Sequence, residues 1–312
     1  MATNILTESG TNEVEFLEFY IGDQSFAINV AKVMQIILFD KDELTVTAGS
    51  SNSVIGTLLW RDSTIDLIDL NVALNSGGGE KTEKTERSIV LITNFNNVTS
   101  GFLISGVNRI HRMDWGEIHA IDTMLGKYSP RFTGTISIDN KNILLIDFES
   151  LIAEICATDA LEELSDGVKL TGSVTDKRKQ KNLIFAEDSI LIRANMTKYL
   201  EEAGYKVNAF ENGQSAYNFI VKRKAQLTDK SKITDFVDLI ITDIEMPVMD
   251  GLTLCRKIKE DSEIFDLPVM IFSSLINDQM TEKCKEVGAD GYVSKPRSQQ
   301  LISQVDKILS VS

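Results

Sequence analysis

The sequence predicts two domains of different fold class, an all-β domain followed by an α/β domain built on a parallel sheet. Its 312 residues are enough for about two domains of ~150 residues each. Short strand patterns separated by turns fill residues 13–158, whereas strand and helix patterns alternate over residues 182–312. The polar stretch 159–181 between them is predicted to be a linker, and residues 1–12 a disordered N-terminus.

Composition and charge narrow the possible functions. The chain has 43% hydrophobic and 25% charged residues, which is ordinary for a soluble globular protein. Of the net charge of −14, −11 falls in residues 1–160 and −3 in residues 161–312, so neither half offers the basic surface that nucleic acid requires. No apolar stretch approaches the ~18 residues of a membrane span. The three cysteines are far apart and lack CxxC spacing, which predicts reduced packing residues in a cytosolic protein.

The all-β prediction for the first half depends on pairs of alternating strands around short turns. The pairs are 16–21 with 25–30, 54–60 with 63–70, 89–92 with 101–104, and 132–138 with 142–147. Many short strands at this spacing are typical of small barrels or of a sandwich. Residues 148–156 then predict a short closing helix.

This half contains no recognisable catalytic arrangement. The run Gly77-Gly78-Gly79 is not followed by GK[ST] or by a helix, so it predicts a flexible charged loop instead of a phosphate-binding loop. No Ser/His/Asp, Cys/His or paired-carboxylate pattern is present. We therefore expect a binding domain and not an enzyme.

The order and spacing of these strand blocks resemble the CheW family of coupling proteins, across about residues 13–158. The matching blocks are 16–19 with 26–33, 55–56 with 60–62 and 68–70, 101–107, and 133–136 with 144–147. The resemblance implies two small SH3-like β-barrels that dock the cytoplasmic tips of chemoreceptors and a histidine kinase. Arg61 matches the family's interface arginine, and Trp60 beside it is a reasonable partner-binding anchor. The alternatives are a solvated Arg61 on a hairpin turn and a Trp60 packed between the barrels.

The second half reads as five strands alternating with five helices. The predicted strands are 183–186, 206–210, 239–242, 269–272 and 291–293, and the helices are 189–203, 213–227, 251–260, 278–287 and 298–310. Strand 239–242 is short, apolar and β-branched, as buried parallel strands are. It ends on Asp243, because Pro247, Asp250 and Gly251 are turn residues. Parallel sheets place ligand sites at this end of their strands.

Polar side chains follow several of these strands and predict one site. Glu187 and Asp188 follow the first strand, Asp243 the third, Ser273 the fourth and Lys295 the fifth. Neighbouring carboxylates repel, and Mg²⁺ (or Mn²⁺) would compensate them. Asp243 is then a nucleophile that accepts a phosphoryl group, while Ser273 and Lys295 bind the phosphate. Taken singly, the acids fit a helix start, the serine a cap and the lysine a solvated surface; together, in this strand order, they favour the phosphorylation site.

This half resembles the receiver domain of response regulators, across about residues 182–310. The resemblance implies a flavodoxin-like sheet of order 2-1-3-4-5 and phosphorylation of Asp243 by a histidine kinase. It also implies a metal site of Glu187, Asp188, Asp243 and the backbone carbonyl of Glu245. Tyr292 matches the family's switch aromatic, although a packing tyrosine on an edge strand is the alternative. Glu187 departs from the commoner Asp, and Glu245 places a carboxylate near the path of attacking water, so we expect it to alter autodephosphorylation.

A CheW-like domain followed by a receiver resembles the CheV type of coupling protein. The resemblance predicts a cytoplasmic chemotaxis adaptor, recruited to membrane-bound receptor arrays without inserting into the membrane. Its coupling of receptors to the kinase would change when Asp243 is phosphorylated, which allows adaptation. Two alternatives are a receiver that acts mainly as a phosphate sink for the kinase, and a response regulator with a phosphorylation-gated N-terminal effector domain.

Overall fold

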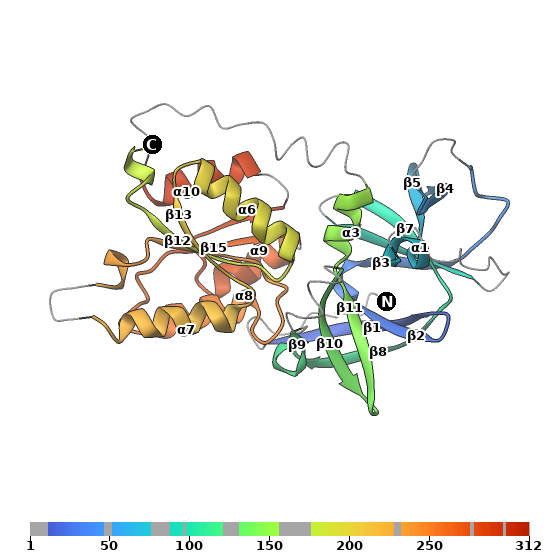
Figure 1. Ribbon diagram of the computed structural model, residues 1–312, viewed down its shortest axis with the longest axis horizontal. Coiled ribbons are helices and arrows are strands. Elements are labelled where there is room, and N and C mark those ends of the chain that lie inside the picture. The colour runs from blue at the N-terminus through green and yellow to red at the C-terminus, as the bar shows by residue number, and fades with distance from the viewer. Residues whose placement is uncertain are drawn as a thin grey trace. The chain divides into compact units, whose positions relative to one another are not determined.

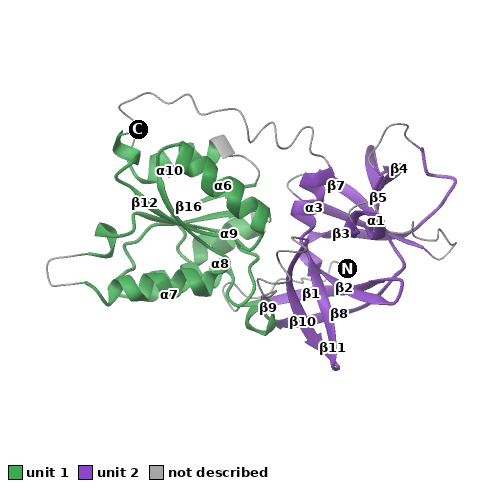
Figure 2. Ribbon diagram, in the orientation of Figure 1, with its two compact units in different colours: residues 1–13, 114–120, 158–312 green, residues 14–113, 121–157 purple. Residues whose placement is uncertain are grey.

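A computed structural model describes residues 12–46, 52–75, 88–95, 98–120, 131–155, 176–227, 232–274, 278–295 and 298–311. The chain divides into two compact units (Figure 2): unit 1 has residues 1–13, 114–120 and 158–312, and unit 2 has residues 14–113 and 121–157. The predicted glycine loop 77–79, most of the predicted N-terminus and linker residues 159–175 lie outside the described residues. None of the described helices is long and apolar enough to cross a membrane.

The all-β prediction for the N-terminal region is confirmed by two sheets (Figure 1). One has the order β8-β1-β2-β11-β10-β9 and the other β3-β6-β7-β5-β4. Their strands are β1 (Glu13–Ile21), β2 (Gln24–Asn29), β3 (Val33–Leu38), β4 (Val54–Trp60), β5 (Ser63–Asp69), β6 (Ile89–Phe95), β7 (Val98–Ile104), β8 (Gly106–Asp114), β9 (His119–Ala120), β10 (Phe132–Ile138) and β11 (Lys141–Ile146). Short helical segments are η1 (Val30–Lys32), α1 (Leu70–Leu74), η2 (Trp115–Glu117) and α3 (Phe148–Ile155). The predicted closing helix corresponds to α3.

The core of unit 2 is centred on the first residue of α3, Phe148, which is 2% exposed. The ring of Phe148 lies edge-on to Phe102 at 4.9 Å and stacks on Phe95 at 5.6 Å, measured between centroids. Phe19 on β1 packs against it from the other sheet, with centroids 6.4 Å apart. Aromatic contacts of this kind hold the two sheets and α3 around one apolar cluster.

A polar cluster joins β1 to β8 beside this core. The imidazole Nε2 of His111 lies 2.8 Å from Oε2 of Glu18, and Asn108 donates its amide hydrogen to the same oxygen at 3.0 Å. Burial alone would raise the pKa of Glu18, but hydrogen bonds from His111, Asn108 and Ser25 outweigh it and lower the pKa. The ionised form of Glu18 is therefore the form that the fold stabilises.

We expect Glu18→Gln to destabilise the β1–β8 pairing at neutral pH by about 1.5–3 kcal/mol, the range for hydrogen bonds to a charged group. Because the folded-state pKa lies below the unfolded value of about 4.3, the stabilisation is present above that pH and is lost as pH falls through the folded-state pKa. Amides of β1 and β8 should exchange faster in Glu18→Gln than in the natural chain at pH 7, and this difference should shrink as pH falls through the folded-state pKa of Glu18. Glu15→Gln, on the same strand, is the control; equal effects of the two variants would contradict the prediction.

The C-terminal sheet is parallel and has the order β13-β12-β14-β15-β16, which confirms the predicted 2-1-3-4-5 topology. Its strands are β12 (Asn182–Ala186), β13 (Lys206–Phe210), β14 (Leu239–Thr242), β15 (Val269–Ser273) and β16 (Gly291–Ser294). Its helices are α6 (Ile190–Glu202), α7 (Gly213–Lys224), α8 (Gly251–Glu260), α9 (Asp278–Glu286) and α10 (Ser298–Ile308), with the short η3 (Ile233–Asp235) before β14.

Helices cover both faces of this sheet, as Figure 1 shows. Leu183 and Phe185 of β12 point to the side of α6 and α10, and Ile184 and Ala186 to the side of α7, α8 and α9. The central strands are consequently buried on both faces, which explains their continuous apolar sequence. The polar residues that follow these strands therefore stand at one edge of a rigid layer.

Arg178, near the end of the predicted linker, packs against the C-terminal helix. Its guanidinium donates Nε–H to Oδ1 and Nη2–H to Oδ2 of Asp306 on α10, at 2.9 and 2.6 Å. The same side chain donates to the backbone oxygen of Ala203 at 3.1 Å, and the hydroxyl of Tyr205 donates to Asp306 at 2.5 Å. Arg178 is only 5% exposed, so the chain is already fixed to this unit before β12 begins.

Candidate functional site

Asp243 follows β14 at the centre of the parallel sheet. Its backbone N–H donates to the oxygen of Ala186 at the end of β12, at 2.9 Å, so the two strands still pair where the site begins. The side-chain Oδ1 accepts the N–H of Ile244 at 2.6 Å, which fixes the carboxylate on its own backbone. Asp243 is only 3% exposed, so its carboxylate is surrounded by protein and not by bulk water.

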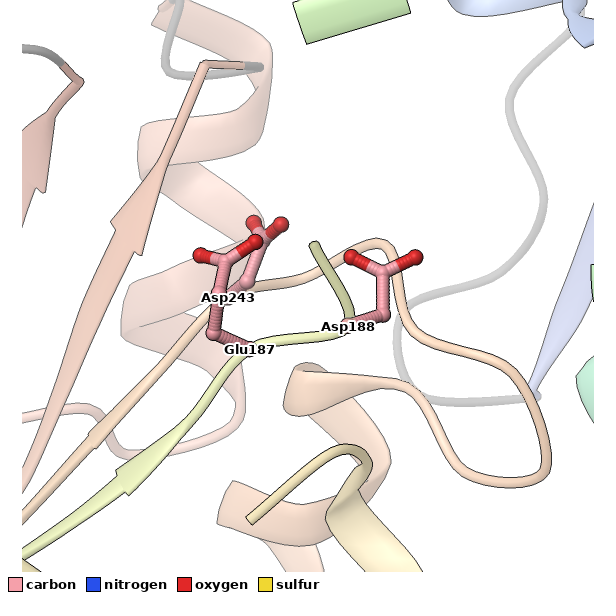
Figure 3. A group of neighbouring side chains, drawn as sticks. All are labelled: Glu187, Asp188 and Asp243. Carbon is pink, nitrogen blue, oxygen red and sulfur yellow. The ribbon is translucent and has the colours of Figure 1, made fainter. Parts of the chain in front are cut away.

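Two further carboxylates lie beside Asp243 (Figure 3). Glu187 and Asp188 follow β12, and one oxygen from each of the three acids lies within 4.8 Å of the others. Glu187 is fully buried, whereas Asp188 is half-buried. The structure thus brings the three predicted acids together at the carboxyl ends of adjacent strands.

The predicted lysine completes the group. The Nζ of Lys295 lies 2.7 Å from Oε2 of Glu187 and 2.9 Å from Oδ2 of Asp243, and the lysine is 2% exposed. The backbone N–H of Lys295 donates to the backbone oxygen of Ser273 at 3.3 Å. The fully buried Ser273 therefore lies next to Lys295, at the end of β15. The ammonium group of Lys295 offsets one of the three carboxylate charges and holds Glu187 and Asp243 in place.

The donor set fits a hard divalent cation. Three carboxylates with one ammonium carry a formal charge of −2, which a divalent cation balances. Carboxylate oxygens are the ligands that Mg²⁺ and Mn²⁺ prefer, and Mg²⁺ retains some of its waters, which a half-buried Asp188 permits. The site therefore has the chemistry for a divalent cation and, next to it, a nucleophilic carboxylate.

The other two predicted residues of this site, Glu245 and Tyr292, lie in the turn after β14 and on β16. Glu245 is half-buried in the turn after β14, and its side chain is not part of the cluster of three carboxylates found among the described residues; that its backbone carbonyl is a metal ligand stays a prediction. Tyr292 lies on β16, opposite Ile271, with 41% of its surface exposed. Tyr292 is therefore not packed into the core.

The predicted anchor pair on unit 2 occupies the turn between β4 and β5. Arg61 is exposed, has φ +53°, and places its guanidinium carbon 4.3 Å from the ring centroid of Trp60. Trp60 is half-buried against the apolar cluster of the five-stranded sheet, and its Nε1–H donates to Oε1 of Gln35 on β3 at 3.0 Å. The guanidinium of Arg61 thus stacks on the Trp60 ring, which is held in place by its packing against the sheet and by its hydrogen bond to Gln35.

Sequence reasoning did not identify an apolar stripe on β3 near this pair. Met34, Ile36 and Leu38 are 46%, 41% and 71% exposed, at alternate positions of β3, and Leu59 on β4 is 72% exposed. Hydrophobic exposure at every second residue of a strand marks one open face of a sheet. The sequence carries no clear signal for this stripe, because β3 reads VMQIIL, in which Gln35 is the one polar residue, and such a run does not reveal which face of the strand is covered.

Comparison with known families assigns both halves of the chain. The CheW-like domain model matches residues 15–156, and the response regulator receiver domain model matches residues 183–306. The chain is of the CheV type. It carries a CheW-like domain and a receiver domain in this order. Each match begins within the first strand of its domain, β1 or β12; the first match ends immediately after the last helix, α3, and the second within the last helix, α10.

Two curated relatives match this chain over nearly their whole length. The CheV-type chain is 28% identical to chemotaxis protein CheV3 of Helicobacter pylori, covering 99% of both chains. It is 25% identical to chemotaxis protein CheV2 of the same organism, covering 96% of both chains. Among solved structures, the scaffolding protein TtCheW from Thermoanaerobacter tengcongensis is 18% identical, with a TM-score of 0.37; the match covers 43% of this chain and 88% of that one.

Proposed function

We propose that the chain is a chemotaxis adaptor whose CheW-like domain couples receptors to a histidine kinase, and that phosphorylation of Asp243 modulates this coupling. The observation that carries the proposal is the group of Glu187, Asp188, Asp243 and Lys295 at one edge of the receiver sheet, of which all but the half-buried Asp188 are buried. Three adjoining carboxylates repel one another and lower the stability of the sheet, so a purely structural role does not explain them.

Each polar residue of the receiver site has its own role in phosphoryl transfer. An oxygen of Asp243 attacks the phosphorus of a phosphohistidine, a P–O bond forms as the P–N bond breaks, and the imidazole leaves with the electron pair of the broken bond. Glu187 and Asp188 would hold Mg²⁺, which when bound neutralises charge on the transferred phosphoryl oxygens. Lys295 already contacts Asp243 at 2.9 Å and can move to a phosphoryl oxygen, and the Ser273 hydroxyl can donate to another.

Phosphorylation changes the charge balance of a buried site. It adds about −1.5 to −2 charges next to Lys295, whose present partners are Glu187 and Asp243. Movement of Lys295 and Ser273 towards the phosphate would shift the end of β16, the strand that carries the exposed Tyr292. This strand is therefore the part of the receiver that we expect to report phosphorylation.

The CheW-like domain supplies the binding surface in this proposal. Arg61, stacked on the ring of Trp60, and the exposed apolar side chains of Met34, Ile36 and Leu38 on β3 and Leu59 on β4 offer the two kinds of contact that dominate protein interfaces. Such a surface suits a kinase domain or a receptor tip, and it would place the protein in the cytoplasm at membrane-bound receptor arrays. The acidic net charge argues against a nucleic acid partner.

Reconstitution with chemoreceptors and the histidine kinase tests the proposal. With the natural chain, we expect kinase output after a sustained stimulus to return towards its starting level. With Asp243→Ala, receptors and kinase should still be coupled, but this return should be lost. Coupling that is absent with both proteins would contradict the adaptor role, and an unchanged return with Asp243→Ala would contradict control by phosphorylation. If Asp243→Ala only prolongs kinase signalling and leaves adaptation intact, the receiver is a phosphate sink.

A further inference from the structure

Arg193 makes two contacts with the backbone of the acidic pair, Glu187 and Asp188. It lies in the first turn of α6, where its backbone N–H donates to the oxygen of Ser189 at 2.9 Å. Its side-chain Nη1 donates to the backbone oxygens of Glu187 and Asp188, at 2.5 and 2.9 Å. One guanidinium nitrogen therefore bridges the carbonyls of the two residues whose side chains face Asp243.

These two carbonyls belong to the turn between β12 and α6. The strand ends at Ala186 and the helix is capped by Ser189, so Glu187 and Asp188 lie outside both regular elements. The N–H of Glu187 still donates to the oxygen of Phe210 on β13, at 3.0 Å, which fixes one side of the turn. Arg193 fixes the opposite side, because its half-buried side chain holds the carbonyl groups that point away from the sheet ladder.

We propose that Arg193 is a positioning residue for the divalent cation site: it fixes the backbone that sets the places of the Glu187 and Asp188 carboxylates. The inference rests on the proposed function of these acids as metal ligands. It has particular weight for Glu187, whose side chain is one methylene longer than aspartate and has one more rotatable bond. The carboxylate of Glu187 can reach Lys295 and the acid cluster reproducibly only if its backbone is held.

Two effects of Arg193 on a cation have opposite signs, and this makes the inference testable. Its positive charge near the site repels a bound cation, so removal of the charge alone should tighten metal binding. Its hydrogen bonds order the ligands, so removal of the bonds should weaken metal binding, typically by 10- to 100-fold for groups that orient metal ligands. A lysine keeps the charge but cannot reproduce the planar geometry of the guanidinium.

The experiment compares Arg193→Lys and Arg193→Met in the full chain, without any phosphoryl donor. Affinity for Mg²⁺ is measured by isothermal titration calorimetry, and affinity for Mn²⁺ by electron paramagnetic resonance. We expect both variants to bind either ion at least about 10-fold more weakly than the natural chain. Arg223→Lys is the matched control, because Arg223 on α7 bonds to Gln226 and does not contact the acidic pair; its affinity should be unchanged.

The possible outcomes separate the inference from the function on which it rests. If Arg193→Lys binds Mg²⁺ like the natural chain and Arg193→Met binds it more tightly, only the charge of Arg193 matters and the inference is overturned. If the natural chain shows no saturable Mg²⁺ binding, the proposed metal site itself is wrong. Hydrogen exchange provides a second readout: amides of residues 187–193 should exchange faster in Arg193→Lys while those of β14 and β15 do not. Faster exchange throughout the sheet would show general unfolding and would also overturn the inference.

Discussion

Asp243→Asn is expected to abolish phosphorylation of the chain by acetyl phosphate, a loss of more than about 1,000-fold in rate. The substitution removes the anionic oxygen that attacks phosphorus but keeps an oxygen that accepts the N–H of Ile244, so the local backbone should remain. Incorporation of the phosphoryl group is measured by intact-protein mass spectrometry at matched Mg²⁺ concentration.

A distant aspartate serves as the control for this variant. Asp261 at the end of α8 pairs with Lys224 and lies outside the acid cluster, so Asp261→Asn should be phosphorylated at the natural rate. Phosphorylation that persists in Asp243→Asn would show that another residue is the acceptor. It would also remove the role proposed for Lys295 as the group that passes from carboxylate to phosphate.

Gly251→Ala is expected to have the second largest effect, although position 251 bears no chemical group. A Cβ atom at this position would lie 1.9 Å from the backbone oxygen of Asp243 and 3.0 Å from Oγ1 of Thr242. A backbone carbonyl cannot rotate away as a side chain can, so α8 or the Asp243 backbone must move. We expect a loss of about 1–3 kcal/mol of stability and a fall of about 100-fold in phosphorylation rate, as for a nucleophile displaced by ~1 Å.

Gly291→Ala is the matched control within the same sheet. Its added Cβ would meet the Cδ1 of Ile308 at 3.1 Å, and a terminal methyl group can yield. Urea unfolding and acetyl phosphate labelling of the two variants should therefore differ clearly. Equal behaviour of Gly251→Ala and Gly291→Ala would mean that the approach of α8 to the Asp243 carbonyl does not hold the site.

The receiver sheet was predictable from sequence because its strands are buried on both faces and end at polar residues. The predicted strand 239–242 coincides with β14, and the acids that follow two strands meet because parallel strands end at the same edge. The strand order itself came from the resemblance, since alternation of strand and helix does not specify it. Arg193 could not be predicted, because a long side chain that reaches back to two carbonyls leaves no pattern in the sequence.

The first half was harder to predict, for reasons visible in particular residues. The structure contains β3 and β8, which the strand pairing did not include, and β3 exposes Met34, Ile36 and Leu38 where a covered strand would bury them. Strand 63–70 was predicted one residue too long, because Asp69 caps the five-residue helix α1 by accepting the N–H groups of Asn71 and Val72. A helix this short has no periodicity to detect.

The attachment of Arg178 to Asp306 has a practical consequence for dissecting the protein. An excised receiver that starts at β12 would leave the Asp306 carboxylate on α10 with the Tyr205 hydroxyl but without its cationic partner, and would uncover the last turn of α6 at Ala203. A lower free energy of unfolding in such a fragment would result from the missing Arg178 contacts and not from the fold of the natural domain.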